Sequence, residues 1–362
     1  MAESLAPVSE RLRQLVNGYQ VTQAISVAVT LGVPDLIASG VRGADDLASR
    51  TGAHPRSLYR LLRALTGLGV LREHGDRDGQ AFELTELGEG LRSDAPGSLA
   101  GWAAFVSRPY HWEAWGDLLR TVRTGEEAFA ARHEGESVWK WRERHPEESR
   151  IFDRAMSAIA AIVATRLADN YDFGRFSRVA DLGGGDGTLI ATVLPRHPGV
   201  RGVLFDLPHV VAGAQTTLDR AGVAGRCEVI AGSFFDSVPS GCDAYMLKSI
   251  LHDWDDASSA RILQTVAEAA GPGTTLLIVD RVVADHTPAA SVVMSDLNMM
   301  VNTGGVERTV SEWRALAESG GFEMTGTVDM GAGWHVIEAS TTQTTGTPPG
   351  ERPVEAPQLG EG

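Results

Sequence analysis

A glycine-rich turn and a single acid on the following strand could together bind a nucleoside. The turn spans residues 183–187 (Gly-Gly-Gly-Asp-Gly) after an apolar run at 178–182, and Asp206 ends a second apolar run at 202–206. Glycines let the backbone approach a ligand closely, and a carboxylate one strand away can accept hydrogen bonds from both ribose hydroxyls. In the dinucleotide fingerprint two residues separate the last two glycines, whereas only one does here. A nucleoside without a phosphate therefore fits this turn better than a dinucleotide does.

A histidine in the segment 247–256 (Leu-Lys-Ser-Ile-Leu-His-Asp-Trp-Asp-Asp) is a candidate general base. The unperturbed pKa of an imidazole, about 6.5, suits removal of a proton near neutral pH. Asp280 and Glu307 could orient the other ring nitrogen of His252, as carboxylates do for catalytic imidazoles. Each residue also has a simpler explanation, because a histidine can cap a helix or fill a core and a lone carboxylate usually lies on the surface.

Three acids directly after His252 could in principle bind a magnesium ion. Asp253, Asp255 and Asp256 offer the carboxylate oxygens that hard cations prefer. However, they precede a predicted helix that begins near Ala257, where the helix dipole favours negative side chains. We therefore predict no metal site. Lys248 could be a solvated surface residue or part of the same site as the histidine four positions after it.

The second half of the chain alternates between apolar strands and helices, which predicts a doubly wound parallel sheet. Ligands of such sheets bind beyond the carboxyl ends of the strands. The candidate residues named above fall at those ends, and so do Ser233 and Phe234, where an aromatic ring could flank an adenine. The predicted strands cover residues 178–182, 202–206, 227–231, 243–247 and 275–280, and a last strand at 334–339 closes the domain.

The first part of the chain has the order helix, turn, helix and hairpin, which is the pattern of a winged helix. A helix from Gln20 that ends before Gly32 precedes short helices at 43–52 and 54–65 and a hairpin at 69–84. This pattern raises the alternative of a DNA-binding regulator. Residues 1–92 contain ten arginines and eleven acidic residues, so a basic surface for DNA is missing. We therefore predict a dimerisation module and a homodimer.

Composition and charge argue against several classes of protein. The chain has 362 residues and a net charge of −15, whereas general nucleic-acid binding needs a basic surface. No apolar run approaches the roughly 20 residues that cross a bilayer, and the start of the chain lacks the pattern of a secretory signal. Cys227 and Cys242 are the only cysteines and do not have a metal-type spacing. We expect a cytoplasmic protein with reduced thiols and no nucleic-acid or membrane partner.

The segment between the two halves is helical and rich in aromatic residues, which could line a pocket for a flat apolar molecule. Packing into a core is the simpler explanation for most of them. We predict a dimerisation domain at 1–100, a helical connector that contributes to the substrate pocket at 101–170, a nucleoside-binding domain at 171–340 and a disordered tail at 341–362. The residues predicted to contact a substrate are Trp102, Phe105, Trp112, Phe152, Met156, Met294, Asn298 and Met299.

Five motifs occur in a fixed order along the chain. They are Asp181-Leu-Gly-Gly-Gly-Asp-Gly187, Phe205-Asp-Leu-Pro-His209, Gly232-Ser-Phe-Phe235, Leu247-Lys-x-x-Leu-His-Asp-Trp254 and Gly304-Gly-Val-Glu-Arg-Thr309. Together they resemble the motifs of the S-adenosylmethionine-dependent O-methyltransferases of the caffeic-acid type and their bacterial natural-product relatives. The resemblance covers nearly the whole chain. It implies an α/β fold with a Rossmann-like, doubly wound methyltransferase sheet, an N-terminal winged-helix dimerisation domain and S-adenosylmethionine as the cofactor.

The same resemblance implies contacts with the cofactor for seven residues. The glycines of the turn would lie along its methionine part and ribose, and Asp206 would hold the ribose hydroxyls. Ser233 stands where the family often has an aspartate, so the hydrogen bond to the adenine would be rearranged. The full set is Gly183, Gly185, Asp206, Leu207, Ser233, Phe234 and Lys248.

For catalysis the resemblance implies His252 as the general base and Asp280 and Glu307 as its supporting acids. Asp280 replaces a glutamate that is frequent in the family, and its side chain is one methylene shorter. The expected reaction transfers a methyl group to a phenolic hydroxyl of an aromatic secondary-metabolite intermediate. Three alternatives stay open: methylation of nitrogen or carbon, a cofactor-binding relative that performs hydroxylation or decarboxylation, and a winged-helix regulator that is not an enzyme.

Overall fold

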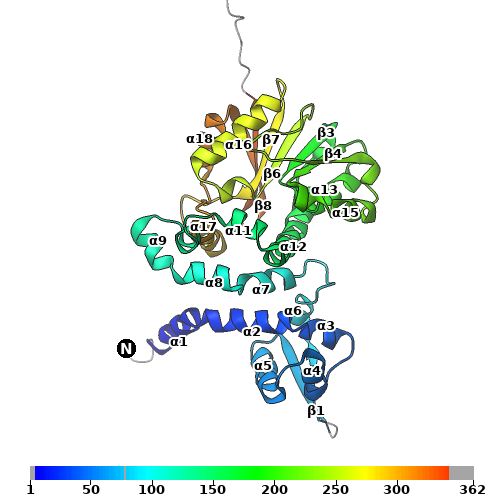
Figure 1. The fold of residues 1–362 in the computed structure, drawn as a ribbon, viewed down its shortest axis with the longest axis vertical. Coiled ribbons are helices and arrows are strands. Elements are labelled where there is room, and N and C mark those ends of the chain that lie inside the picture. The colour runs from blue at the N-terminus through cyan, green and yellow to red at the C-terminus, as the bar shows by residue number, and fades with distance from the viewer. Residues whose placement is uncertain (1–4, 77–78, 342–362) are drawn as a thin grey trace, which may run out of the picture.

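The computed structural model describes residues 5–76 and 79–341. An N-terminal helical region with a small hairpin lies on one side of the molecule, and a sheet covered by helices lies on the other (Figure 1). Two layers of helices run between them, one from each part. Among the described residues, no helix combines the length and the apolar character needed to cross a membrane.

The N-terminal region contains the predicted helix, turn, helix and hairpin. Leu58, Leu62 and Leu65 recur at helical spacing on one face of α5 and are buried in a common core with Phe82 of the hairpin. The hairpin strands pair antiparallel. The elements are α1 (Leu5–Val16), α2 (Gly18–Thr30), α3 (Val33–Ala38), α4 (Ala44–Thr51), α5 (Pro55–Gly67), β1 (Leu71–Asp76), β2 (Gly79–Leu84) and α6 (Glu86–Glu89).

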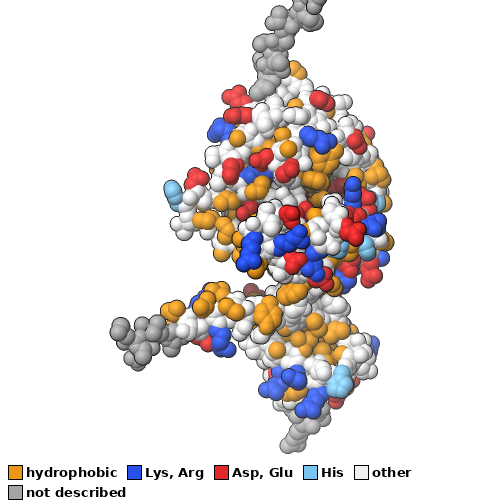
Figure 2. All heavy atoms as spheres, turned by 60° about the vertical axis from the view of Figure 1, so that its left-hand side comes forward, with side chains coloured by type: hydrophobic (Ala, Val, Ile, Leu, Met, Phe, Trp, Pro, Cys, Tyr) orange, Lys and Arg blue, Asp and Glu red, His pale blue; other side chains and the backbone are white. Residues whose placement is uncertain are grey.

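Helices α1 and α2 have an apolar face that no other described part of the chain covers. Figure 2 shows hydrophobic side chains gathered along this arm of the molecule. An exposed apolar patch of this kind marks a surface that binds a protein or a membrane. Its large side chains, each more than half exposed, are Val8, Leu12, Leu15, Val16 and Tyr19.

Six helices connect the N-terminal region to the sheet. Helix α7 packs against α2 on one side and against the long α12 on the other, which joins the two halves of the molecule. Aromatic residues of this segment form a core of their own, in which Phe105, Tyr110 and Phe129 are buried. The helices are α7 (Ala100–Val106), α8 (Pro109–Gly116), α9 (Leu118–Thr124), α10 (Ala128–Arg132), α11 (Val138–Glu143) and α12 (Pro146–Asn170).

The sheet has seven strands in the order β5-β4-β3-β6-β7-β9-β8. The first five strands of that order are parallel, and β9 runs antiparallel to both β7 and β8. The central strands are almost continuously apolar because helices cover both of their faces. The strands are β3 (Arg178–Leu182), β4 (Arg201–Asp206), β5 (Cys227–Ala231), β6 (Ala244–Lys248), β7 (Thr275–Arg281), β8 (Phe322–Gly331) and β9 (Trp334–Thr341).

Helices pack on the two faces of the sheet in separate cores. One core combines residues of α12, α13 and α15, and the other combines residues of α16 and α18. This is the doubly wound arrangement that the alternation of strands and helices predicts. The remaining helices are α13 (Thr188–Val193), α14 (Pro208–Val211), α15 (Ala214–Arg220), α16 (Asp256–Ala269), α17 (Ala290–Asn302) and α18 (Val310–Ser319), with short 3-10 turns at η2 (Phe173–Arg175), η3 (Leu194–Arg196), η4 (Ala224–Arg226) and η5 (Leu251–Asp253).

The structure corrects the sequence-based prediction at one edge of the sheet. Strand β8 was not predicted. It pairs antiparallel with β9, which also pairs antiparallel with β7, at this edge of the otherwise parallel sheet. Strand β9 continues to Thr341, which the prediction had assigned to the disordered tail. The rest of the predicted disordered tail, 342–362, lies outside the described residues.

Candidate active site

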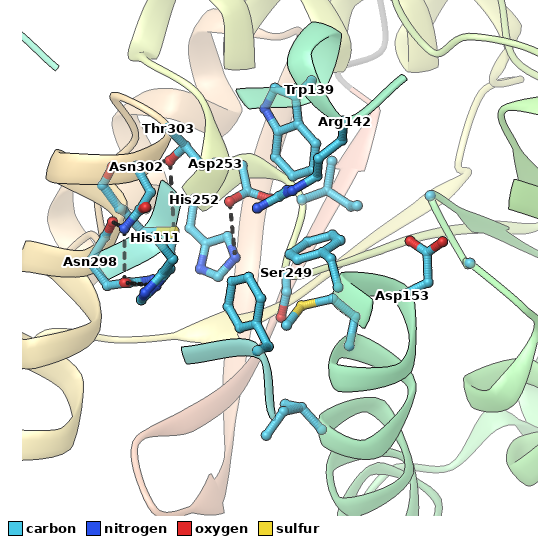
Figure 3. A pocket seen from close by; sticks show the side chains of 18 of the residues that line it. His111, Trp139, Arg142, Asp153, Ser249, His252, Asp253, Asn298, Asn302 and Thr303 are labelled. Atoms are coloured by element: carbon cyan, nitrogen blue, oxygen red, sulfur yellow. Dashed lines mark hydrogen bonds and ion pairs between the residues drawn. The ribbon is translucent and has the colours of Figure 1, made fainter. Parts of the chain in front are cut away.

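A large cavity opens at the carboxyl ends of the parallel strands. Its lining comes from the ends of β3, β4 and β6 and from helices α7, α8, α11, α12 and α17. Figure 3 shows part of this lining. The cavity measures about 1660 Å³, which exceeds the roughly 300–1,000 Å³ of an ordinary ligand pocket. It therefore has room for two molecules side by side.

The glycine-rich turn forms the floor of the cavity at the end of β3. A Cβ atom on Gly183 would lie 2.4 Å from Cδ1 of Ile250, and one on Gly184 would lie 2.4 Å from Cδ1 of Leu204. Gly185 has a φ of +65° and no atom within 4 Å of its ideal Cβ position. A Cβ atom would therefore crowd neighbouring side chains at the first two positions, whereas the third position has open space. Gly183 and Gly185 both have a left-handed backbone, which favours glycine.

The carboxylate of Asp206 holds this turn in place. Its Oδ2 accepts a hydrogen bond from the backbone N–H of Gly185 at 2.9 Å, and its Oδ1 accepts one from Leu207 at 2.7 Å. Burial raises the pKa of Asp206, and these two hydrogen bonds oppose the rise. Each oxygen keeps a further lone pair. Asp206 can thus accept hydrogen bonds from a diol at the edge of the cavity.

Two further charged groups face the cavity near the turn. Asp181 is 1% exposed, and neither of its carboxylate oxygens has a hydrogen-bond partner among the described residues. Burial raises the pKa of Asp181 to about 7 although the charge of Lys248 opposes it, and burial lowers the pKa of Lys248. Unpartnered buried groups are costly unless a ligand satisfies them. A cofactor that carries a nucleoside and an amino-acid group fits these residues.

The remaining predicted cofactor residues lie around the same end of the cavity. Ser233, Phe234 and Leu207 all line it. The hydroxyl of Ser233 accepts a hydrogen bond from the backbone N–H of Phe235 at 3.2 Å. The ring of Phe234 packs against Phe235 at a centroid distance of 5.1 Å. An apolar wall with one small polar group is therefore available for a flat base.

His252 lies in η5, just after β6, with two buried carboxylates behind it. Its Nδ1 is 3.1 Å from Oε1 of Glu307 and 3.2 Å from Oδ1 of Asp280. The side chains of both acids are fully buried. Because two acceptors face Nδ1, this nitrogen carries the proton, and Nε2 is the atom that can exchange a proton with a ligand. His252 itself lines the cavity, whereas the two acids do not.

The charges of this group strengthen the imidazole as a base. Burial alone would lower the pKa of His252, but the carboxylates of Asp280, Glu307 and Asp253 outweigh it and raise the pKa to about 10. Burial raises the pKa of Asp280 to about 7. Burial would also raise the pKa of Glu307, yet the charge and hydrogen bond of His252 lower it below its usual value. Glu307 is thus the ionised partner of the imidazole.

Glu307 is held in place by residues outside the predicted set. The Ser295 hydroxyl donates a hydrogen bond to its Oε1 at 2.7 Å, and Arg281 donates one to the Ser295 hydroxyl. The Glu307 backbone N–H donates to Oδ1 of Asp296 at 2.9 Å. These contacts fix the carboxylate on which the orientation of His252 depends.

The three acids after His252 have separate roles and do not form a cluster. Asp255 caps α16 by accepting a hydrogen bond from the Ser258 backbone N–H, and Asp256 accepts two from the Arg308 guanidinium. Asp253 lines the cavity, and its Oδ1 lies 3.9 Å from Nε2 of His252. The position of Asp253 was not predicted from the sequence, because three adjacent acids before a helix look alike.

His252, Asp280 and Glu307 also have a spacing that a metal ion could bridge, since their ligand atoms lie within 4.8 Å of one another. The two oxygens nevertheless lie at hydrogen-bond distance from Nδ1, so a shared proton accounts for the arrangement.

All eight residues predicted to contact a substrate line the cavity. They come from four helices, and most are apolar. The residues are Trp102 and Phe105 of α7, Trp112 of α8, Phe152 and Met156 of α12, and Met294, Asn298 and Met299 of α17. A flat aromatic molecule suits such a wall.

Asn298 is part of a polar group in this otherwise apolar wall. Its Oδ1 accepts hydrogen bonds from the Trp115 indole at 3.0 Å and from the Asn302 amide at 3.0 Å, and Nε2 of His111 lies 3.1 Å away (Figure 3). An indole N–H can only donate, so the oxygen of Asn298 must face it. No described residue accepts a hydrogen bond from the Asn298 amide nitrogen, which leaves it available to a ligand.

The sequence interpretation missed several lining residues. His111, Trp139 and Arg142 also line the cavity. Aromatic residues at 102–115 indicated that a wall would form there, but no pattern in the sequence indicated that Arg142 would turn inward from α11. Burial lowers the pKa of His111 to about 4, so this imidazole is neutral near pH 7.

Two family models match most of the chain. Residues 115–323 match an O-methyltransferase domain, and residues 13–94 match an O-methyltransferase dimerisation domain.

Curated relatives cover nearly the full length of the chain. The mitomycin biosynthesis 6-O-methyltransferase of Streptomyces lavendulae is 40% identical over 328 residues, which cover 91% of this chain and 93% of the relative. The 8-amino-8-demethylriboflavin N,N-dimethyltransferase of Streptomyces davaonensis is 39% identical over 338 residues, which cover 92% of this chain and 96% of the relative.

A solved structure of similar fold contains two bound small molecules. It is NcsB1, an O-methyltransferase from neocarzinostatin biosynthesis, in complex with S-adenosylmethionine and 2-hydroxy-5-methyl naphthoic acid. The match has a TM-score of 0.74 and 34% identity, and it covers 89% of this chain and 96% of that chain.

Proposed function

The chain belongs to the S-adenosylmethionine-dependent O-methyltransferases, and we propose that it methylates a phenolic hydroxyl of a flat aromatic secondary metabolite with His252 as the general base. The observation that carries this proposal is the position of His252. Its imidazole is held by two buried carboxylates at the edge of a cavity that also contains the nucleoside-type turn.

S-adenosylmethionine, the cofactor of this family, supplies an electrophilic methyl group on a sulfonium. We propose that Asp206 accepts hydrogen bonds from the ribose hydroxyls while Gly183 and Gly185 allow the close approach. Leu207, Ser233 and Phe234 border the base, and Lys248 contributes charge at the amino-acid end. The main support is that these residues line one end of the cavity.

His252 removes the proton of the acceptor hydroxyl at Nε2 in this mechanism. A phenol has a pKa near 10, whereas the ordinary pKa of an imidazole is about 6.5. Proton transfer from a phenol to an ordinary imidazole would therefore be uphill in free energy by roughly 5 kcal/mol. The carboxylates behind His252 raise its pKa to about 10 and close that gap. Proton transfer from the phenol to the neutral imidazole is therefore nearly balanced, and Asp280 and Glu307 stabilise the resulting imidazolium. The same pKa leaves only a small fraction of His252 neutral near pH 7, so the rate increases with pH toward that pKa.

The helical wall positions the acceptor. Trp102, Phe105, Phe152 and their neighbours offer ring faces for stacking, and the methionines of α17 adapt to its outline. Exclusion of water from this apolar space and alignment of the oxygen with the methyl group account for the rest of the rate enhancement.

An amine is the second candidate acceptor because one relative is an N,N-dimethyltransferase. A neutral amine attacks without first losing a proton, so it does not need a strong base. The pair of buried carboxylates behind His252 favours a hydroxyl over an amine on this ground. Methylation of carbon, hydroxylation and decarboxylation would each give a product that differs from an O-methylated phenol, and the test described below distinguishes these products.

We also propose that the enzyme is a cytoplasmic homodimer. The N-terminal residues match a dimerisation domain, and the exposed apolar face of α1 and α2 lies within that part of the chain. The free thiols of Cys227 and Cys242 suit a reducing compartment. Sedimentation of the full chain at the mass of a monomer would contradict the dimer.

To test the function, the enzyme is incubated with methyl-labelled S-adenosylmethionine and a panel of acceptors, and the products are analysed by mass spectrometry. The panel contains phenols, anilines, and derivatives of the phenols in which the hydroxyl is blocked. We expect a mass gain of one labelled methyl on the oxygen of at least one phenol. Labelled anilines together with unreacted phenols would contradict O-methylation, and a product that gains oxygen or loses carbon dioxide would contradict methyl transfer altogether.

A further inference from the structure

The most unusual residue of the acceptor wall is Arg142. It lies on the short helix α11, which begins at its N-cap Ser137 and covers the cavity from one side. The residue is only 5% exposed, yet its Nε and Nη1 have no hydrogen-bond partner among the described residues. Figure 3 shows the side chain extending from α11 toward Asp253 and His252. A guanidinium in this state is a buried charge without a counter-ion.

A second buried arginine in this protein has both a counter-ion and hydrogen-bond acceptors for its guanidinium. Arg308 is 1% exposed, and it donates hydrogen bonds to Oδ1 of Asp256 and to the backbone carbonyls of Leu251 and Trp254. Its charge is paired, and its N–H groups have acceptors. Burial of a charge is costly without such partners. The contrast indicates that Arg142 does not serve to hold the fold together in the way that Arg308 does.

Aromatic rings surround the carbon end of the guanidinium without pairing its N–H groups. Cζ of Arg142 lies 3.6 Å from the ring centre of Phe152 and 5.1 Å from that of Trp139. Such cation–π contacts offset part of the desolvation of the charge. The ring of Tyr110 lies 5.7 Å from Cζ of Arg142, and the hydroxyl of Tyr110 has no hydrogen bond of standard geometry among the described residues. This hydroxyl is nevertheless close enough for the guanidinium to oppose the rise that burial causes in the pKa of Tyr110.

The two acids of the cavity on which the charge of Arg142 acts already have other positive neighbours. Asp253 lies 3.9 Å from Nε2 of His252, and the charge of His209 acts on Asp153. Arg142 influences both acids through its field but forms an ion pair with neither of them. Its own charge is therefore left for a bound molecule.

We propose that Arg142 binds a carboxylate on the aromatic acceptor, so that the preferred substrates are hydroxylated aromatic acids. A carboxylate supplies two acceptor oxygens to the planar guanidinium, which is the geometry that arginine recognises best. The aromatic rings beside Arg142 then stack on the rest of the same molecule. This inference rests on the proposed function for the identity of the reacting group, but the binding preference can be measured without any turnover.

The test compares aromatic hydroxy acids with their neutral methyl esters. Enzyme loaded with S-adenosylhomocysteine is titrated by calorimetry with pairs such as 3-hydroxy-2-naphthoate and its methyl ester, and 4-hydroxybenzoate and its methyl ester. For at least one pair we expect the acid to bind at least tenfold tighter than the ester. In Arg142→Met the acid should lose about 30-fold in affinity or more while the ester changes little, and Arg142→Lys should restore part of the preference.

A matched control is Arg144→Met, which removes an exposed arginine next to α11 that is already paired with Glu136. It should leave the preference for acids unchanged. If every ester in the panel binds the wild type as well as its acid, the proposal is wrong. It is also wrong if Arg142→Met weakens acid and ester equally, because that result assigns Arg142 to packing alone.

The proposed function can fail separately from this inference. Methyl transfer to neutral phenols, followed by mass spectrometry on the same preparations, reports the reaction without any carboxylate. A preference for acids without transfer to any acceptor would contradict the function and leave the anion site standing. Should Arg142→Met not fold, the comparison of acid with ester in the wild type and in Arg142→Lys still decides the matter.

Discussion

The Nδ1 atom of His252 lies 3.1 Å from Oε1 of Glu307, although 55 residues separate them in the chain. His252 follows β6, whereas Glu307 follows α17, and Asp280 at the end of β7 completes the group. The side chains of both acids are shielded from solvent, so the imidazole is the member of the group through which protons can leave or enter.

Replacement of the imidazole should stop turnover without affecting the cofactor. His252→Ala removes the proton acceptor, and we expect kcat to fall about 10²- to 10⁴-fold. Affinity for S-adenosylmethionine, measured by calorimetry, should stay within about twofold of the wild type. The control is His286→Ala, which removes an exposed histidine outside the cavity. Normal turnover at saturating cofactor would refute the assignment of His252.

Loss of one supporting acid should change the pH dependence of the reaction. Asp280→Asn or Glu307→Gln removes a negative neighbour, which lowers the pKa of His252 from its raised value of about 10. Since the base must be neutral to accept a proton, kcat/KM rises with pH through that pKa. The rise should therefore occur at lower pH in the variants, and the plateau should be lower. An unchanged midpoint with the same acceptor would show that the acids act on folding alone.

Asp206 should matter for the cofactor before it matters for chemistry. Asp206→Ala removes the acceptor of two backbone N–H groups and the proposed acceptor for the ribose. We expect the Kd for S-adenosylmethionine to rise about 10- to 100-fold, which corresponds to the roughly 1–3 kcal/mol of a lost charged hydrogen bond. Asp219→Ala, on α15 outside the cavity, is the control. Equal affinities in the two variants would rule out this role.

Adjacent glycines of the turn should respond differently to alanine. A Cβ at position 184 would lie 2.4 Å from Leu204 and 2.7 Å from Asp181, so Gly184→Ala should lose about 1–3 kcal/mol of stability, visible as a lower Tm. Gly185→Ala meets no atom within 4 Å and has only the strain of its φ of +65°. Its main effect should be on cofactor affinity. A Gly185→Ala variant that binds the cofactor normally would argue against a site at this turn.

Chelation of metal ions should have no effect on the reaction. The hydrogen bonds of His252 account for the spacing of the group it forms with Asp280 and Glu307. We therefore expect full activity after prolonged treatment with EDTA and dialysis. Loss of activity that is restored by a divalent cation, but not by buffer, would instead support a metal ion between these side chains.

The parallel strands and the residues at their ends could be predicted from the sequence, because short apolar runs that alternate with helices indicate a parallel sheet. Strand β8 was missed although its alternation of buried and exposed residues is a strand pattern, because it includes Glu323 and Asp329, residue types that are depleted in strands. Its antiparallel pairing with β9 depends on a tertiary arrangement that no local pattern contains.

The site shows the same division between local and long-range information. The residue types of His252, Asp280 and Glu307 indicated their chemistry, and the resemblance to the family linked them. Asp253 and Arg142 were not predicted to face the cavity, because their inward orientation depends on how η5 and α11 pack. The sequence around Arg142 is rich in charged residues. From the sequence alone, a buried arginine in this segment cannot be distinguished from one that is exposed to solvent.

The proton-accepting group and most of the surface that selects the acceptor come from different parts of the chain. His252 and its acids belong to segments after β6, whereas Trp102, Phe105, Trp112, Arg142 and Phe152 belong to the helices before the sheet. Substitutions in those helices can alter which compound is accepted while the chemistry is inherited intact. Descendants of one ancestor could in this way diversify into many biosynthetic routes without ever passing through an inactive intermediate.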